Sequence, residues 1–185
     1  MDMPRYFYKN TYHHLYNRGV DKKKIFFDEK DYLYFMRKMT EYKKKYLIKI
    51  LCYCLMPNHF HLFVKQTEDT GISEFIRDLI NAYTRGTNVR YKSKGFLFES
   101  KTKSKIITED EYYRWICKYI LINPVTAGLV ITAEDWEYSS AKEYFGLKQE
   151  GLTDIDEILS RYKDTVDFKT FITTDFRKFD YSVLF

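Results

Sequence analysis

The sequence predicts an α+β fold in which helices cover one face of an antiparallel β-sheet. The 185 residues suit a single domain, and the 7 glycines and 3 prolines form no linker that would divide it. Short apolar segments typical of strands and longer helical segments follow one another in the order β-α-β-β-α-β. This order defines the ferredoxin-like (RRM-like) unit, and we expect its second sheet face to be open for binding.

Each expected element has a local signal. Apolar runs bounded by polar residues indicate strands, and the alternation of apolar with polar residues is clearest from residue 59 onwards. The last helix should end at Asn123, because the residue before a proline avoids the α region. The expected strands are 11–17, 48–55, 59–66 and one near 106–107, and the expected helices are 29–46, 72–90 and 110–122.

We assign residues 1–146 to this domain. Residues 147–185 form a helical C-terminal extension whose role the composition does not indicate. One helix, over 154–162, is expected in it.

Two histidines stand two residues apart on the third expected strand. Because side chains alternate along a strand, His59 and His61 share one face, whereas Phe60 and Leu62 lie on the other. Two imidazoles at this separation can ligate one metal ion. The pair alone is equally consistent with two half-exposed polar residues on the solvated face of a sheet.

A tyrosine and an asparagine near the end of the last expected helix lie on one helical face. Tyr119 and Asn123 are four residues apart, so both can face the histidine pair. Each also has a structural reading, because tyrosines on apolar helical stripes usually pack in the core and Asn123 can simply end the helix. Only the combination of the two elements indicates a reaction centre.

At these residues the sequence resembles a known family, the REP-associated tyrosine transposases, a branch of the single-tyrosine HUH transposases. The resemblance runs from about residue 8 to residue 146, in the family's order. It rests on Tyr12-His13, Arg18-Gly19, the run 54–62, the run 119–130 and Tyr138-Ser139-Ser140.

The resemblance implies a DNA endonuclease and strand transferase. In this family two histidines and a polar residue four positions after the tyrosine hold a divalent metal, and the tyrosine attacks single-stranded DNA. Carried over, the metal ligands are His59, His61 and Asn123, and the nucleophile is Tyr119. We also expect Arg18 to contact DNA. The tyrosine would become esterified to the 5′ phosphate. We expect Mg²⁺ or Mn²⁺, single-stranded or hairpin DNA, and a monomer or a homodimer with swapped sites.

Clustered positive charge and aromatic rings also favour a nucleic-acid partner. The net charge is +5, and basic residues are interleaved with aromatic ones between residues 83 and 105. Phosphates suit the cations, and unpaired bases suit the rings. The expected contacts are Tyr83, Arg85, Arg90, Tyr91, Lys92, Lys94, Phe98, Lys101 and Lys103. Because Phe98, Glu99 and Lys101 depart from the family's usual pattern after the glycine, the target sequence stays open.

Three cysteines allow a rival metal site. Cys52 and Cys54 precede the histidines, but their spacing is shorter than in zinc sites and they stand in an apolar strand, which favours buried thiols. With Cys117 the count is odd, and there is no signal peptide or long apolar run. These features predict a cytoplasmic protein without a membrane partner.

The main alternative function is a non-catalytic module that binds single-stranded nucleic acid on the same sheet, as RNA-recognition motifs do. Such a module has no use for converging metal ligands. The joint presence of His59, His61 and Tyr119 therefore favours the enzyme, and a covalent protein–DNA adduct separates the two.

Overall fold

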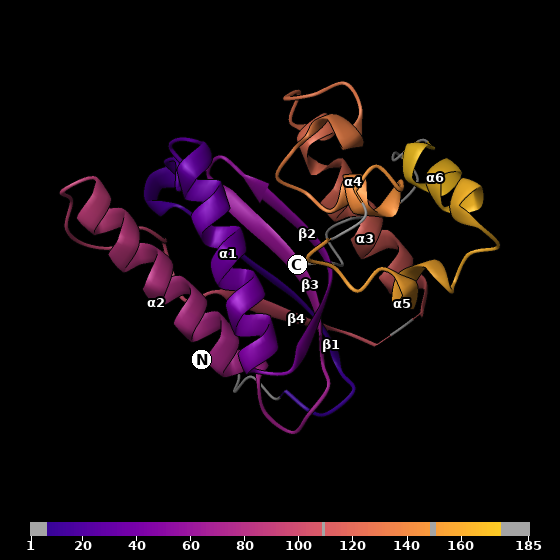
Figure 1. The fold of residues 1–185 in the computed structure, drawn as a ribbon, viewed down its shortest axis with the longest axis horizontal. Coiled ribbons are helices and arrows are strands. Elements are labelled where there is room, and N and C mark those ends of the chain that lie inside the picture. Colours follow the sequence, from indigo (N-terminus) through magenta and orange to yellow (C-terminus); the bar gives the residue numbers. More distant parts are fainter. Residues whose placement is uncertain (1–6, 109, 149–150, 175–185) are drawn as a thin grey trace.

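A four-stranded antiparallel sheet separates two layers of helices in the computed structural model, which describes residues 7–108, 110–148 and 151–174 (Figure 1). The spatial order of the strands is β2-β3-β1-β4. The α+β, ferredoxin-like prediction is confirmed, because α1 follows β1 and α2 follows β3. The elements are β1 (Tyr12–Arg18), α1 (Glu29–Lys45), β2 (Ile48–Met56), β3 (His59–Gln66), α2 (Ile72–Arg90) and β4 (Lys103–Ile107).

A tight hairpin fixes the start of β3, where the two histidines stand. Met56 of β2 pairs with His59 of β3, so only Pro57 and Asn58 form the turn. The segment after β1 holds this turn in place, because the Ile25 N–H donates to the Pro57 carbonyl at 2.8 Å. The histidine strand therefore begins at a rigid point of the sheet.

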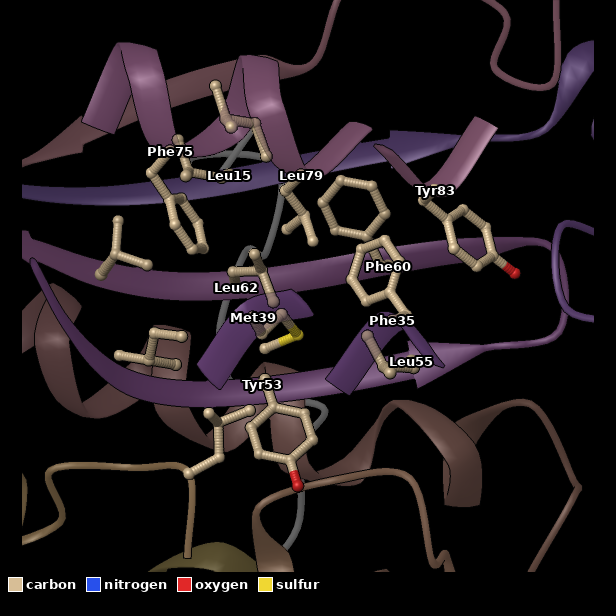
Figure 2. Close-up of a cluster of buried hydrophobic side chains, with 14 of the residues drawn as sticks. Leu15, Phe35, Met39, Tyr53, Leu55, Phe60, Leu62, Phe75, Leu79 and Tyr83 are labelled. Atoms are coloured by element: carbon tan, nitrogen blue, oxygen red, sulfur yellow. The ribbon is translucent and has the colours of Figure 1, made fainter. Parts of the chain in front are cut away.

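One face of the sheet carries the core beneath α1 and α2 (Figure 2). Alternate residues of each strand point into it, as the pattern of β3 predicts. A fully buried side chain of this size contributes about 1.5–3 kcal/mol. The sheet supplies Leu15, Tyr53, Leu55, Phe60 and Leu62, α1 supplies Phe35 and Met39, and α2 supplies Phe75, Leu79 and Tyr83.

The second face of the sheet is covered by helices over much of its area, and the prediction of an open face is wrong in that respect. Cys52, Cys54 and Phe63 on this face are fully buried against residues of α3 such as Ile116 and Ile120. The reason lies in β2, whose apolar residues point to both faces and require cover on both. The helices on this side are α3 (Asp110–Thr126), α4 (Ala141–Tyr144), α5 (Asp156–Leu159) and α6 (Thr165–Thr173). A short 3-10 turn at Ala133–Asp135 packs with them, and another, at Val20–Lys22, follows β1.

Helix α3 does not end at Asn123 as predicted. It continues through Pro124 to Thr126, and the Ala127 N–H donates to the Asn123 carbonyl at 3.0 Å. Proline lacks an N–H and so breaks a mid-helix hydrogen bond, but here it lies in the last turn, where little of the helix follows. As a result Asn123 stays in helical register with Tyr119, one turn earlier.

The described part of the C-terminal extension packs on the same face of the sheet as α3. Residues 149–150 and 175–185 lie outside the described residues. The expected helix 154–162 is shorter, Asp156–Leu159, and α6 was not expected. Glu157 of α5 accepts hydrogen bonds from Tyr12, Lys49 and Lys65 of the sheet. None of the described helices has a span long and apolar enough to cross a membrane.

Candidate active site

A cleft of about 270 Å³ opens on the second face of the sheet, beside α3. Residues of β1, β3, α3 and the segment leading into β4 meet around it. The lining residues are Tyr16, Asn17, Arg18, His59, His61, Glu99, Lys103 and Tyr119. Five of the predicted site residues, Arg18, His59, His61, Lys103 and Tyr119, therefore share one cavity.

The predicted metal ligands converge at the start of β3. The rings of His59 and His61 lie 5.1 Å apart between centroids, and His59 Nε2 lies 3.1 Å from Asn123 Oδ1. On its other side, His59 Nδ1 lies 2.7 Å from Asn58 Oδ1, whose amide nitrogen donates to the Lys22 carbonyl. A carboxamide oxygen only accepts, so in the tautomer with its proton on Nδ1 His59 donates to Asn58 and turns its Nε2 lone pair towards Asn123.

This arrangement fits a divalent cation. Two lone pairs that face each other repel, and a cation between them relieves the repulsion. Adjacent ligands about 2.1 Å from an octahedral ion are separated by about 3.0 Å, close to the separation of His59 Nε2 and Asn123 Oδ1. Within the described residues no group of three or more His, Cys, Asp and Glu side chains is arranged to hold a metal. The Asn123 carboxamide oxygen would be the third protein ligand, because it lies 3.1 Å from His59 Nε2.

Burial keeps both histidines neutral. His61 is buried, and desolvation, with His14 and His59 nearby, holds its pKa well below the usual value. Desolvation also lowers the pKa of His59, and the side chain of Asn123 has a smaller opposing effect. Neutral imidazole is the form that ligates metals.

Tyr119 stands edge-on to the histidine pair. Its ring centroid is 5.2 Å from that of His61, at an interplanar angle of 84°. Burial raises the pKa of Tyr119 to about 12, although the side chain of Asn123 partly offsets the increase. A phenol in this state is protonated at neutral pH, so it needs positive charge nearby before it can attack.

Gly19 allows the chain to hold Arg18 at the edge of the cleft. A Cβ on Gly19 would lie 2.1 Å from the Lys23 carbonyl oxygen, so only glycine permits this approach. The Gly19 N–H donates to Asn58 in the hairpin turn at 2.8 Å. Half of the Arg18 side chain is exposed, and its Nε donates to Glu99 at 2.6 Å.

Two of the rings predicted to stack on bases are buried instead. Tyr83 is fully buried in the core and its hydroxyl donates to the Ile25 carbonyl at 2.6 Å (Figure 2). Phe98 is 7% exposed and packs edge-on against Phe60. The prediction for Tyr83 and Phe98 is therefore wrong, because the apolar face of α2 and the sheet core take these rings.

Two further predicted contacts belong to an ionic cluster between α1 and α2. The guanidinium of Arg90 bonds to Asp28 and Asp31, and the Tyr91 hydroxyl donates to Asp31 at 2.9 Å. The charge of Arg90 is thus neutralised by two carboxylates at the start of α1, which disfavours the predicted contact with DNA. Lys92 and Lys94 are exposed on the loop that follows.

Arg85 and Lys101 lie outside the cleft, along the side of α2. Arg85 lines a groove of about 500 Å³ beside Phe96, whose side chain is 93% exposed. Lys101 lines an adjoining groove of about 290 Å³. Ile80 lines both grooves, so the two grooves lie next to each other.

Sequence reasoning missed several residues around the histidines. Tyr16 and Glu99 line the cleft, and His14 lies within 2.9 Å of His61. The alternation of β1 puts His14, Tyr16 and Arg18 on one face, but only the register with β3 reveals that this face meets the histidines. The three cysteines are free and buried, as predicted, and burial raises the pKa of the Cys54 thiol.

Comparisons with known proteins identify the family of this chain. The family model described as "Transposase IS200 like" matches residues 7–123. No curated protein matches this chain. The solved structure of a REP-associated tyrosine transposase bound to a REP hairpin superposes with a TM-score of 0.68 at 19% identity, covering 82% of this chain and 89% of that one. A transposase candidate from Deinococcus radiodurans R1 gives a TM-score of 0.45 at 16% identity, over 70% of this chain and 98% of that one. Because the family model covers more than half of the sequence, including both histidines, Tyr119 and Asn123, the chain belongs to the IS200-like transposase family.

Proposed function

We propose that this transposase cleaves and rejoins single-stranded or hairpin DNA through a covalent bond between Tyr119 and a 5′ phosphate, with a divalent metal held by His59, His61 and Asn123. The observation that carries the proposal is that His59, His61 and Tyr119, from β3 and α3, line one cleft, and that Asn123 Oδ1 lies 3.1 Å from His59 Nε2. A REP hairpin is bound by the structural neighbour, which supports hairpin DNA as the substrate here.

The chemistry follows from the surroundings of Tyr119. Its oxygen forms a bond to phosphorus, the bond from phosphorus to the 3′ oxygen breaks, and the phenolic proton ends on the released 3′ hydroxyl. The phosphotyrosine keeps the energy of the broken bond, so a second 3′ hydroxyl can reverse the reaction without a nucleotide cofactor. Arg18 and Lys103 at the cleft supply positive charge for the phosphates on either side.

The metal would supply the positive charge that the buried phenol lacks. His59, His61 and Asn123 would hold Mg²⁺ or Mn²⁺, and the ion would neutralise charge that develops on the scissile phosphate. Imidazole ligands favour Mn²⁺ over Mg²⁺. The Asn123 side chain also interacts with Tyr119, so one residue can orient both the ligand set and the nucleophile.

A single chain supplies the whole site. Tyr119 lies beside the histidines of its own chain, so the proposed reaction does not need a tyrosine from a partner. The alternative, a binding module without catalysis, relies on rings on an open sheet face. Phe63 at the middle of that face is buried beneath α3, so no observation favours this alternative.

The test is a covalent adduct on a denaturing gel. We expect a 3′-labelled pool of hairpin oligonucleotides with randomised single-stranded flanks to become attached to the wild-type protein in Mn²⁺. Tyr119→Phe should form no adduct while still binding DNA. The control is Tyr112→Phe, also half-buried and two turns earlier on α3, which should keep activity. Equal adduct from Tyr119→Phe and wild type would overturn the proposal.

A further inference from the structure

A third imidazole group lies directly behind the proposed metal ligands. His14 of β1 is fully buried, and its Nε2 lies 2.9 Å from Nδ1 of His61 on β3. In the strand register His61 pairs with Tyr16, so His14 and His61 are diagonal neighbours on one sheet face. Their rings are nearly parallel, with centroids 5.1 Å apart.

The position of the His14 ring is defined by its other neighbours. It stacks on Tyr16 with centroids 4.8 Å apart, and its edge meets Tyr119 at 6.3 Å. A fully buried polar ring costs stability unless its nitrogens are hydrogen-bonded, and an apolar residue would fill the same space without that cost. The contact with His61 supplies such a hydrogen bond, which an apolar residue at this position could not make.

The contact between the two histidines limits where their protons can be. Only one of the two facing nitrogens can carry the shared proton. If His61 ligates a metal through Nε2, its proton must sit on Nδ1, and Nδ1 then donates to Nε2 of His14. Metal-bound histidines usually have their second nitrogen held in this way, and the partner sets the tautomer and ring orientation.

The second histidine of the pair shows the same arrangement. Nδ1 of His59 lies 2.7 Å from the Asn58 carboxamide oxygen, which cannot donate. Each proposed ligand thus has a neighbour on its Nδ1 side, Asn58 for His59 and His14 for His61. Both Nε2 atoms are then the unprotonated nitrogens available to a cation.

We propose that His14 is a positioning residue that accepts a hydrogen bond from Nδ1 of His61 and so holds His61 in the tautomer able to ligate a divalent metal. The proposal rests on the proposed function for the metal, but it makes a separate statement about the metal-free protein. There, His61 is protonated on Nδ1.

The test compares four variants with the wild type. His14→Phe keeps a stacked ring without an acceptor, and His14→Leu serves in its place if His14→Phe does not fold. His14→Gln restores an acceptor. His13→Leu is the matched control, because His13 is 2% exposed on the same strand but faces the opposite side of the sheet. Thermal melting confirms that each variant is folded.

Two measurements need neither DNA nor activity. Long-range ¹H–¹⁵N spectra of the metal-free protein at pH 8 report the tautomer of His61. We expect the proton on Nδ1 in wild type, His14→Gln and His13→Leu, and a shift towards Nε2 in His14→Phe. Titration with Mn²⁺ alone should show about 10- to 100-fold weaker binding in His14→Phe, with recovery to within a few-fold in His14→Gln.

The outcomes separate the two proposals. A wild-type His61 with its proton on Nε2, or a His14→Phe protein that binds Mn²⁺ as the wild type does, overturns the role of His14. Wild-type protein that binds no Mn²⁺ contradicts the metal-dependent function itself and the role of His14 with it. The role of His14 is also overturned if His13→Leu binds Mn²⁺ as weakly as His14→Phe does, because the loss would then follow from general destabilisation.

Discussion

Removal of one carboxylate should loosen the C-terminal extension from the sheet. Glu157 on α5 has a side chain only 14% exposed, and it accepts hydrogen bonds from Tyr12, Lys49 and Lys65. The change Glu157→Gln keeps the size of the side chain but removes its charge. Lys65, itself 18% exposed, then loses its anionic partner.

The size of the effect follows from the pKa of Glu157. Burial alone would raise it, but the hydrogen bonds from Lys65, Tyr12 and Lys49 outweigh burial and lower it from 4.5 to about 2. A shift of roughly 2.5 units corresponds to about 3 kcal/mol. Because Lys49 is 43% exposed and solvent screens its charge, we expect about 2 kcal/mol at pH 7.

The sign of the pH dependence is also determined. A carboxyl group whose pKa is lower in the folded than in the unfolded protein stabilises the fold above the unfolded pKa, and the stabilisation disappears as the pH falls through the folded pKa. The advantage of wild type over Glu157→Gln should therefore be complete above about pH 5 and less than half as large at pH 3. Glu157→Gln itself cannot titrate at this position.

Urea unfolding followed by circular dichroism at pH 7 and pH 3 measures this difference. The matched control is Glu68→Gln, which removes a carboxylate from an exposed pair with Lys9 and should change stability little. A difference between wild type and Glu157→Gln that is the same at both pH values would refute the assignment of the pKa shift to this cluster.

The remaining predictions concern the cleft. His59→Ala should abolish cleavage with little loss of stability, because the His59 side chain is half-buried. Activity within a few-fold of wild type in a cleavage assay with Mn²⁺ would contradict a ligand role. Mixing His59→Ala with Tyr119→Phe protein should restore no activity, because one chain supplies the whole site; recovery in the mixture would show that tyrosines are exchanged between subunits. Arg18→Ala and Lys103→Ala should each weaken the binding of single-stranded DNA and make that binding less dependent on salt. Lys9→Ala should change neither, because Lys9 is half exposed and does not line the cleft. Filter binding across a salt series measures both effects.

The sequence predicted much of the fold because its signals are local. The alternation along β3 places His59 and His61 together without any knowledge of the rest of the chain. The four-residue spacing of Tyr119 and Asn123 is likewise a property of one helix, and it survives the extension of α3 past Pro124. Contacts within one element are therefore readable from the sequence.

Contacts between elements were the source of the errors. Whether Tyr83 faces solvent or the core depends on the angle at which α2 packs on the sheet, which the interleaved lysines do not reveal. The cover of the second face depends on where α3 and α6 return. The contact of His14 with His61 depends on the register between β1 and β3, and shifting that register by one residue would point His14 away.

The most direct test of the central claim is the identity of the amino acid joined to DNA. After reaction of the wild-type protein with hairpin DNA in Mn²⁺, nuclease and trypsin digestion leave a short nucleotide remnant on one peptide. Because trypsin cleaves after Lys118, the account predicts the remnant on the peptide that begins at Tyr119, with fragment ions that place it on Tyr119 rather than on Tyr138. A remnant on Tyr16, the other tyrosine that lines the cleft, or on any residue other than Tyr119 would contradict the account.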